Sequence, residues 1–225
     1  MKSVHFFFAA AILVGACNKN GTVDLNFEAK DNDRLIDVDF GGVAATFDNG
    51  DIRLAIGKIS LEGDQTVELI ADPTGVAIIA DGGKGNSIND QLKGLEVPPG
   101  SYNNLKIELI QADGAVADES GEPALETRSY HGAGLLTVDG VADLDTKTYV
   151  VFAVTVDLPI DLTIDEKGSG TVTVDFDLNA LYAGVDFSDS TIEGTTRFIR
   201  EEEVANQAVM LDNVENGDVL TATAQ

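Results

Sequence analysis

Residues 154–178 read VTVDLPIDLTIDEKGSGTVTVDFDL, and this segment decides the fold class of the chain. Apolar side chains alternate with polar ones on both sides of a Gly-rich stretch, EKGSG, at 166–170. A period of two is typical of a strand with one buried face. The apolar faces hold Val154, Val156, Leu158, Ile160, Leu162 and Ile164, and then Val172, Val174, Phe176 and Leu178. The pattern predicts two antiparallel strands joined as a hairpin.

The solvent face of this predicted hairpin is acidic. It carries Asp157, Asp161, Asp165, Asp175 and Asp177. The five-residue loop would place Asp161 opposite Asp175, and like charges opposed in a ladder are destabilising. Calcium accepts irregular sets of carboxylate oxygens, so Asp161, Asp175 and Asp177 form a candidate calcium site. The alternative is a solvated face that protects an edge strand, since Pro159 marks this strand as an edge.

The same alternation recurs along the chain and predicts an all-β domain. Further strands are expected at 23–29, 35–40, 51–62, 67–71, 76–80, 102–111, 134–138 and 149–165, with weaker ones at 195–199 and 219–223. Turns are expected at 48–51, 72–75, 98–100 and 216–218, and short helices at 88–95 and 179–182. The apolar set of 51–62 changes phase at Gly57, which predicts a β-bulge there. The domain is expected to span 23–225, with 184–225 as a possible irregular C-terminal extension.

The N-terminus has the organisation of an export signal. MKSVHFFFAAAILVGAC at 1–17 has a positive charge at Lys2 and an apolar run at 6–14 that is too short to cross a bilayer. Gly15 and Ala16 are the small residues required before a cleavage site. Residues 1–16 are therefore expected to be a signal peptide.

The cleavage site closely resembles the lipobox of bacterial lipoproteins. Val14-Gly15-Ala16 precede Cys17, the one cysteine of the chain. The resemblance implies that Cys17 receives a diacylglycerol and, after cleavage, an acyl chain such as palmitate, so that residues 17–22 become an acylated tether to the lipid bilayer. Asn18 implies transfer to the outer membrane of the cell envelope. The alternative is a free thiol at Cys17 in an ordinary secretory signal, which is a liability in an exported chain.

The charge of the chain excludes some partners. The 225 residues include 39 acidic and 14 basic side chains, giving a net charge of −25. Nucleic acid and anionic lipid headgroups are repelled by such a surface. Hydrophobic residues make up 44% of the chain and are arranged periodically, so the acidic residues decorate a folded surface rather than a disordered chain.

A second resemblance concerns the domain itself. LEVPPGSYNNLKIEL at 95–109, followed by TVTVDFD at 171–177, resembles a bacterial lipoprotein domain of unknown function with Pro-Gly-x-Tyr and Asp-Phe-Asp motifs. The Pro-Gly-x-Tyr motif also occurs in transthyretin-like and other immunoglobulin-like sandwiches, where the tyrosine packs a corner. The resemblance implies an immunoglobulin-like or transthyretin-like antiparallel β-sandwich, with Tyr102 buried at a strand entry. It implies no reaction.

Residues suited to catalysis are few, so no catalytic residue is assigned. His131 is the sole histidine outside the signal, it lacks a Gly-x-Ser-x-Gly motif, and we expect it at the surface. We predict a binding or structural module with an unidentified protein or glycan partner and no certain cofactor. The alternative is a carboxylate-dependent carbohydrate hydrolase, because the chain has many acids. The absence of Trp and the presence of only four Tyr weigh against a sugar cleft.

Overall fold

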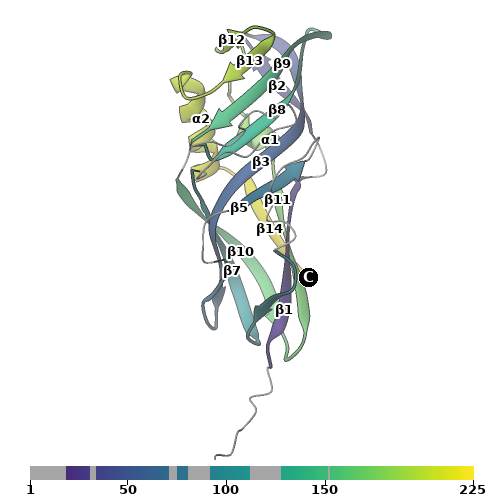
Figure 1. Cartoon of the computed structure of the whole chain (residues 1–225), viewed down its shortest axis with the longest axis vertical. Helices are drawn as coiled ribbons and strands as arrows, with labels where there is room; N and C mark the ends of the chain where they lie inside the picture. The colour runs from purple at the N-terminus through teal and green to yellow at the C-terminus, as the bar shows by residue number, and fades with distance from the viewer. Residues whose placement is uncertain (1–18, 31–33, 71–74, 81–91, 112–127, 152) are drawn as a thin grey trace, which may run out of the picture.

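The computed structural model describes residues 19–30, 34–70, 75–80, 92–111, 128–151 and 153–225, and these are mostly β-structure. Two mixed β-sheets pack against each other in an elongated, sandwich-like molecule (Figure 1). The described residues form two helices, α1 (Leu178–Leu181) and α2 (Val204–Asn216). Neither helix, nor any other helix in the described ranges, has the length and apolarity needed to cross a bilayer.

The smaller sheet has four strands in the order β14-β11-β1-β6. These strands are β14 (Leu220–Ala224), β11 (Ser169–Phe176), β1 (Gly21–Ala29) and β6 (Leu95–Val97). β1 runs parallel to β11, whereas β14 and β6 are antiparallel to their neighbours. The small sheet therefore contains both β1, the first strand described, and β14, the last.

The larger sheet has ten strands and is organised around β3 (Val43–Gly63), a strand of 21 residues. The main path runs through β10 (Val154–Ile164), β7 (Gly100–Leu109), β3, β8 (Tyr130–Val138), β9 (Val141–Val150), β13 (Thr196–Ile199) and β12 (Thr191–Glu193). β2 (Leu35–Phe40), β5 (Gly75–Ala80) and β4 (Val67–Ile70) pair in turn along the other edge of β3. β13 is parallel to β9, so this sheet is mixed as well.

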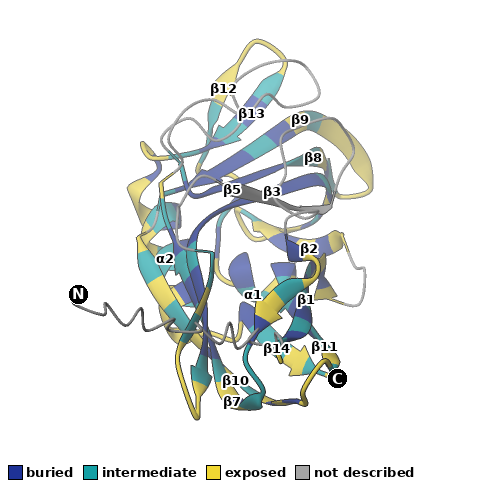
Figure 2. Cartoon of the chain, turned by 60° about the horizontal axis from the view of Figure 1, so that its bottom comes forward, coloured by how far each residue is buried: buried dark blue, intermediate teal, exposed yellow. Residues whose placement is uncertain are grey.

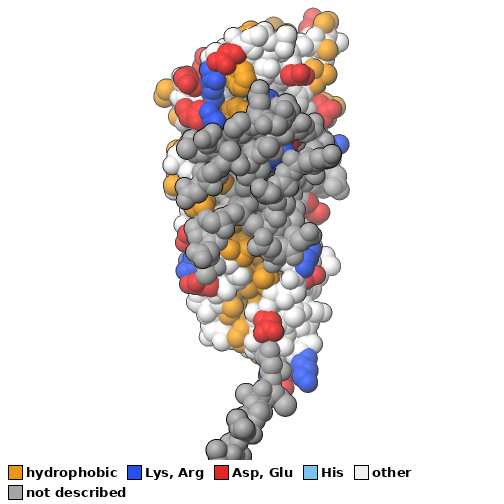
Figure 3. Space-filling view, viewed as in Figure 1, with side chains coloured by type: hydrophobic (Ala, Val, Ile, Leu, Met, Phe, Trp, Pro, Cys, Tyr) orange, Lys and Arg blue, Asp and Glu red, His pale blue; other side chains and the backbone are white. Residues whose placement is uncertain are grey.

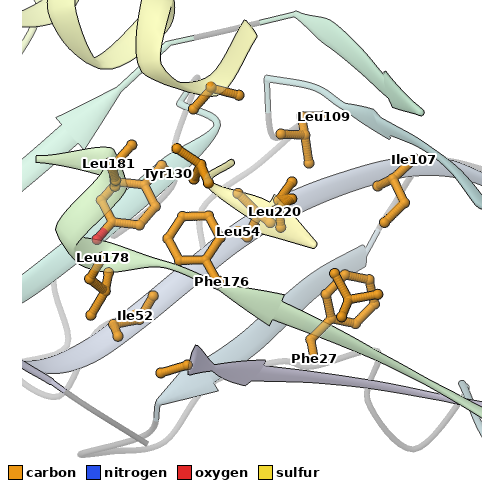
Figure 4. Close-up of a cluster of buried hydrophobic side chains, with 14 of the residues drawn as sticks. Phe27, Ile52, Leu54, Ile107, Leu109, Tyr130, Phe176, Leu178, Leu181 and Leu220 are labelled. Carbon is orange, nitrogen blue, oxygen red and sulfur yellow. The ribbon is translucent and has the colours of Figure 1, made fainter. Parts of the chain in front are cut away.

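The apolar core lies between the two sheets. Phe27 and Phe176 of the small sheet face Ile52, Leu54 and Tyr130 of the large one (Figure 4). The rings of Tyr130 and Phe176 stack with their centroids 5.7 Å apart. Buried residues line the inner parts of the strands, and exposed residues gather at loops and hairpin ends (Figure 2). The alternation seen in the sequence therefore marks the inward faces correctly.

The predicted hairpin at 154–178 is wrong, although both of its strands exist. β10 pairs with β7 in the large sheet, and β11 pairs with β1 and β14 in the small one. The segment 165–168 forms a turn, in which Gly168 N–H donates to Asp165 C=O at 2.9 Å, and this turn carries the chain from one sheet to the other. The alternation fixes which side chains point inward, but it does not choose the neighbouring strand.

Other predictions also need correction. The sheets are mixed rather than purely antiparallel. Residues 48–51, expected as a turn, lie inside β3 as a bulge opposite β8. Residues 184–225 are not an irregular extension, because they supply β12, β13, α2 and β14. The turn at 72–75 and the helix at 88–95 fall mostly outside the described residues, although Leu95 begins β6.

Several local predictions are confirmed. The pairing of β3 with β7 steps from Ile56 to Ile59 while β7 steps from Leu109 to Ile107, so one extra residue sits at the predicted Gly57 bulge. The short helix expected at 179–182 is α1. Tyr102 is buried, and its hydroxyl donates to the Pro98 carbonyl at 2.7 Å.

Candidate functional site

A groove of about 420 Å³ lies between β10, β14 and the C-terminal end of α2. β10 ends the large sheet and β14 ends the small one, and the two strands lie side by side (Figure 1). The groove therefore follows the open side of the sandwich. Its lining consists of residues 154–159 of β10, Val214, Glu215, Gly217 and Asp218 at the end of α2, and residues 220–222 of β14.

The groove combines apolar walls with an acidic rim. Leu158, Val214 and Leu220 are apolar side chains that contribute to the core as well as to the lining. Asp157 is held by Asn104 at 2.9 Å and lies 3.5 Å from Lys106 Nζ, so it already has partners on β7. Among the described residues that line the groove, none is aromatic. This composition suits an apolar or amphipathic ligand better than a sugar ring.

A second polar cluster lies on the outward-facing side of β3 and β8. The Arg53 guanidinium donates through Nε to Asp51 Oδ1 at 2.9 Å, and His131 Nδ1 lies 3.9 Å from Asp51 Oδ2. Arg53 and His131 are 0% exposed and Asp51 is 5% exposed. The 3.9 Å separation is too long for a hydrogen bond. The expectation that His131 lies at the surface is wrong, because alternation along β8 places it on a face that is covered.

His131 also belongs to a row of stacked rings across β8, β9 and β13. Its ring lies 5.0 Å from that of Tyr149, which in turn lies 6.4 Å from the ring of Phe198. Guanidinium groups sit over both aromatic rings, with Arg128 4.3 Å from Tyr149 and Arg200 5.0 Å from Phe198. Cation–π contacts of this kind stabilise packing on a sheet face. Stacking in this row explains His131 as a residue that packs on the sheet.

The inward face of the same strands holds a buried hydrogen-bond network. The Asn49 amide donates to the Tyr130 hydroxyl at 3.0 Å, the two hydroxyls of Tyr130 and Tyr182 are 2.9 Å apart, and Thr148 Oγ1 is 2.5 Å from the Tyr182 hydroxyl. Burial raises the pKa of Tyr130 to about 12, and burial also raises the pKa of Tyr182 well above its usual value. Both phenols therefore stay neutral and serve as hydrogen-bond groups. The network fixes α1 against the large sheet.

The candidate calcium residues are not brought together by strand pairing. Asp161 lies on β10 in the large sheet, whereas Asp175 lies on β11 in the small one, where its neighbours are Glu28 and Thr221. Asp177 is the N-cap of α1 and accepts from the Ala180 N–H at 2.9 Å. In the described ranges no three His, Cys, Asp or Glu side chains form a possible metal-ligand set. The repulsion between Asp161 and Asp175 on which that prediction rested is absent.

Asp177 has a structural role that the sequence did not indicate. Burial acts to raise the pKa of its carboxyl, but the hydrogen bonds from Lys30 Nζ, at 2.8 Å, and from the Ala180 N–H outweigh it, so the pKa is lowered. A carboxylate at a helix N-cap satisfies a backbone donor that would otherwise lack a partner. Cys17 lies outside the described residues.

Comparison with known proteins adds one distant structural similarity. No family model and no curated protein matches the chain. The fold resembles that of MbnP from Methylosinus trichosporium. That match has 14% sequence identity and a TM-score of 0.41, and it covers 91% of this chain and 98% of the other. It assigns neither a family nor a function.

Sequence reasoning missed the groove, because its three walls are far apart along the chain. β10 was predicted, and the weaker strand at 219–223 corresponds to β14, but α2 was not predicted at all. Only Asn206, Met210 and Val214 of α2 are buried, which leaves a weak apolar period. Gly217, where the helix ends, was the one local signal, since Gly commonly follows the end of a helix.

Proposed function

We propose that the protein is a lipid-anchored binding module of the cell envelope, held at the outer membrane through acylated Cys17. Its partner is another polypeptide, which occupies the groove between β10, β14 and α2. The observation that carries the proposal is the groove itself, with apolar walls at the free edges of two sheets. Exposed sheet edges next to apolar pockets are a recurring place for extended peptides to bind.

The hydrolase alternative has less support. Asp157, Glu215 and Asp218 place carboxylates around the groove, but none of its lining residues in the described part of the chain is aromatic. Aromatic faces are the platforms on which sugar rings usually pack, so a described lining without them favours a binding module. This proposal includes two further assignments. The chain is related to the lipoprotein domains of unknown function, and its fold is an immunoglobulin-like or transthyretin-like sandwich.

The proposed anchor would fix the orientation of the module. β1 begins at Gly21, so the tether from Cys17 is about 14 Å long at most when fully extended. The start of β1 lies at one end of the elongated molecule, and the β12–β13 hairpin lies at the other (Figure 1). Under this proposal the β12–β13 end points away from the membrane, and the groove opens to the side.

We expect Cys17→Ser to abolish lipidation. Each buried methylene contributes about 0.8 kcal/mol to membrane binding, and a protein without acyl chains loses that term entirely. In cells labelled with a palmitate analogue, the variant should carry no label and should accumulate as the unprocessed precursor. Equal labelling of the variant and the wild type would refute the lipoprotein assignment.

We expect Ala222→Trp to block the groove, because Ala222 is a small residue in its wall. Thr223→Trp is the matched control, since Thr223 is the next residue of β14, is exposed and does not line the groove. Peptides selected from a random display library on the wild-type protein should bind the Thr223→Trp variant equally well. They should bind Ala222→Trp at least about tenfold more weakly, a loss of about 1.4 kcal/mol. Equal binding to both variants, at unchanged melting temperatures, would place the site elsewhere.

A further inference from the structure

We infer that the groove is selective for a cationic, extended polypeptide segment, in which Lys or Arg side chains alternate with apolar ones. The inference rests on the proposed binding function and goes beyond it, because it names the chemistry of the partner. Three features of the groove carry it: the apolar walls, the negative end of α2, and the free edge of β14.

The walls suit the aliphatic stems of long basic side chains. The apolar residues of this lining include Val156 and Leu158 of β10, Leu220 and Ala222 of β14, and Val214 of α2. Lys and Arg bury their methylene groups on surfaces of this kind while their charged ends reach outward to polar groups. The groove therefore provides an apolar surface along the stem of a basic side chain.

The rim supplies negative potential where the charged ends would lie. α2 has 13 residues, its C-terminal end faces the groove, and its last turn contains no basic residue. The C-terminal end of a helix carries a partial negative charge, which favours cations within about one turn. Glu215 and Asp218 add two carboxylates at this end.

These two carboxylates have no basic partner in the part of the chain that the structure describes. The ion pairs of the described residues involve other acidic side chains, such as Asp157 with Lys106 and Asp177 with Lys30. None of them includes Glu215 or Asp218. Acidic side chains are also dispersed over the face of the molecule shown in Figure 3, in keeping with the net charge of −25. The negative electrostatic potential of this surface attracts cationic segments. Glu215 and Asp218, at the end of α2, provide a defined place for such a segment to bind.

The backbone of β14 favours an extended partner. Thr171 and Gln225 exchange both of their backbone hydrogen bonds at 2.9 Å, and Asp177 N–H donates to the Val219 carbonyl at 2.8 Å. In an antiparallel ladder this alternation turns the N–H and C=O groups of Leu220, Ala222 and Ala224 away from β11. Those groups point toward the open edge, where an extended segment is recognised through its main chain.

Three synthetic peptides of equal length test the inference, with Val alternating with Lys, Ser or Glu. We expect the Val-Lys peptide to bind the wild-type protein most tightly, the Val-Ser peptide more weakly, and the Val-Glu peptide not measurably. Calorimetry at 0.15 M salt measures each affinity, because exposed charges farther apart than about 8 Å are largely screened there. Spermidine serves as a polycation without apolar side chains, and it should bind more weakly than the Val-Lys peptide.

The double variant Glu215→Gln/Asp218→Asn should weaken binding of the Val-Lys peptide by about tenfold, as expected when a charge-assisted hydrogen bond is lost. The matched control is Asp161→Asn/Asp165→Asn, which removes the same charge from exposed residues that do not line the groove. The control should bind the peptide as the wild type does. An equal loss in both double variants would show that only net charge matters, and would overturn the inference.

The outcomes separate this inference from the proposed function. If all three peptides bind equally and all are lost in Ala222→Trp, the groove is a binding site without charge selectivity, so the inference fails and the function stands. If spermidine binds as tightly as the Val-Lys peptide, the site takes cations without the polypeptide, and the inference fails. If no peptide binds and library selection yields none, the proposed function fails as well.

Discussion

Gly134→Ala is expected to destabilise the protein by about 3 kcal/mol or more, the upper part of the range for overpacked sites. A Cβ at this position would lie 1.7 Å from the Asp48 carbonyl oxygen and 3.0 Å from Asn49 Cα. Both contacts are with the backbone of β3, so no side chain can rotate away to relieve them. The strands β3 and β8 would have to separate at the bulge between Asn49 and Asp51.

Gly50→Ala is the matched control for this prediction. Gly50 lies in the same bulge, but a Cβ there meets only the Ala133 carbonyl oxygen, at 3.9 Å, which is ordinary contact. We expect a change within about 1 kcal/mol, as for surface substitutions and Gly-to-Ala changes in open positions. Urea unfolding of the three proteins measures the difference. Similar midpoints for both variants would show that β3 and β8 do not approach as closely as described.

The same bulge shows why composition alone does not predict the course of β3. Asp48-Asn49-Gly50-Asp51 has the composition of a tight turn, and a turn there would have divided β3 into two strands. The structure uses Gly50 as an extra residue in a continuous strand, with Asn49 paired to Gly134 and Asp51 to Ala133. Turns and bulges need the same flexible residues, so composition alone does not distinguish them.

Strand positions were predictable, but strand partners were not. Residues 35–40 form β2 as expected, and β11 appears close to its predicted limits, whereas the strand expected at 149–165 is divided between the end of β9 and β10. The pairing of β10 and β11 depends on contacts with β7 and β1, whose paired residues are 45 or more positions away along the chain. Alternation records which face is buried and carries no information about such distant neighbours.

The candidate site was the least predictable part, for a related reason. Glu215 and Asp218 become significant only because α2 ends beside β10, and β10 lies about 60 residues earlier in the sequence. His131 was expected to be exposed because Ser129-Tyr130-His131-Gly132 was interpreted as a loop or the entry to a strand. Its burial follows from the stacking of Tyr149 on β9, a strand whose first half has no clear alternation.

Tyr102 is the opposite case, because its environment is largely local. The hydroxyl donates to Pro98, four residues earlier, and accepts from Gln65 Nε2 at 3.3 Å. The ring is 1% exposed, at the point where β7 meets the end of β3. The Pro-Gly-x-Tyr motif at 99–102 contains the donor, and the acceptor, Pro98, directly precedes it. The sequence alone was therefore enough to predict this corner.

Tyr102→Ala is therefore expected to cost about 3 to 5 kcal/mol of unfolding free energy, the range for large aromatic residues truncated in cores. Tyr102→Phe keeps the ring and removes only the hydroxyl, so it should cost about 1 kcal/mol, the net value of a typical hydrogen bond. The difference between the two variants isolates the contribution of the buried ring. Thermal and urea unfolding of both variants provide the two values. A loss within about 0.5 kcal/mol for Tyr102→Ala, as for a surface residue, would mean that the ring does not hold β7 to the end of β3.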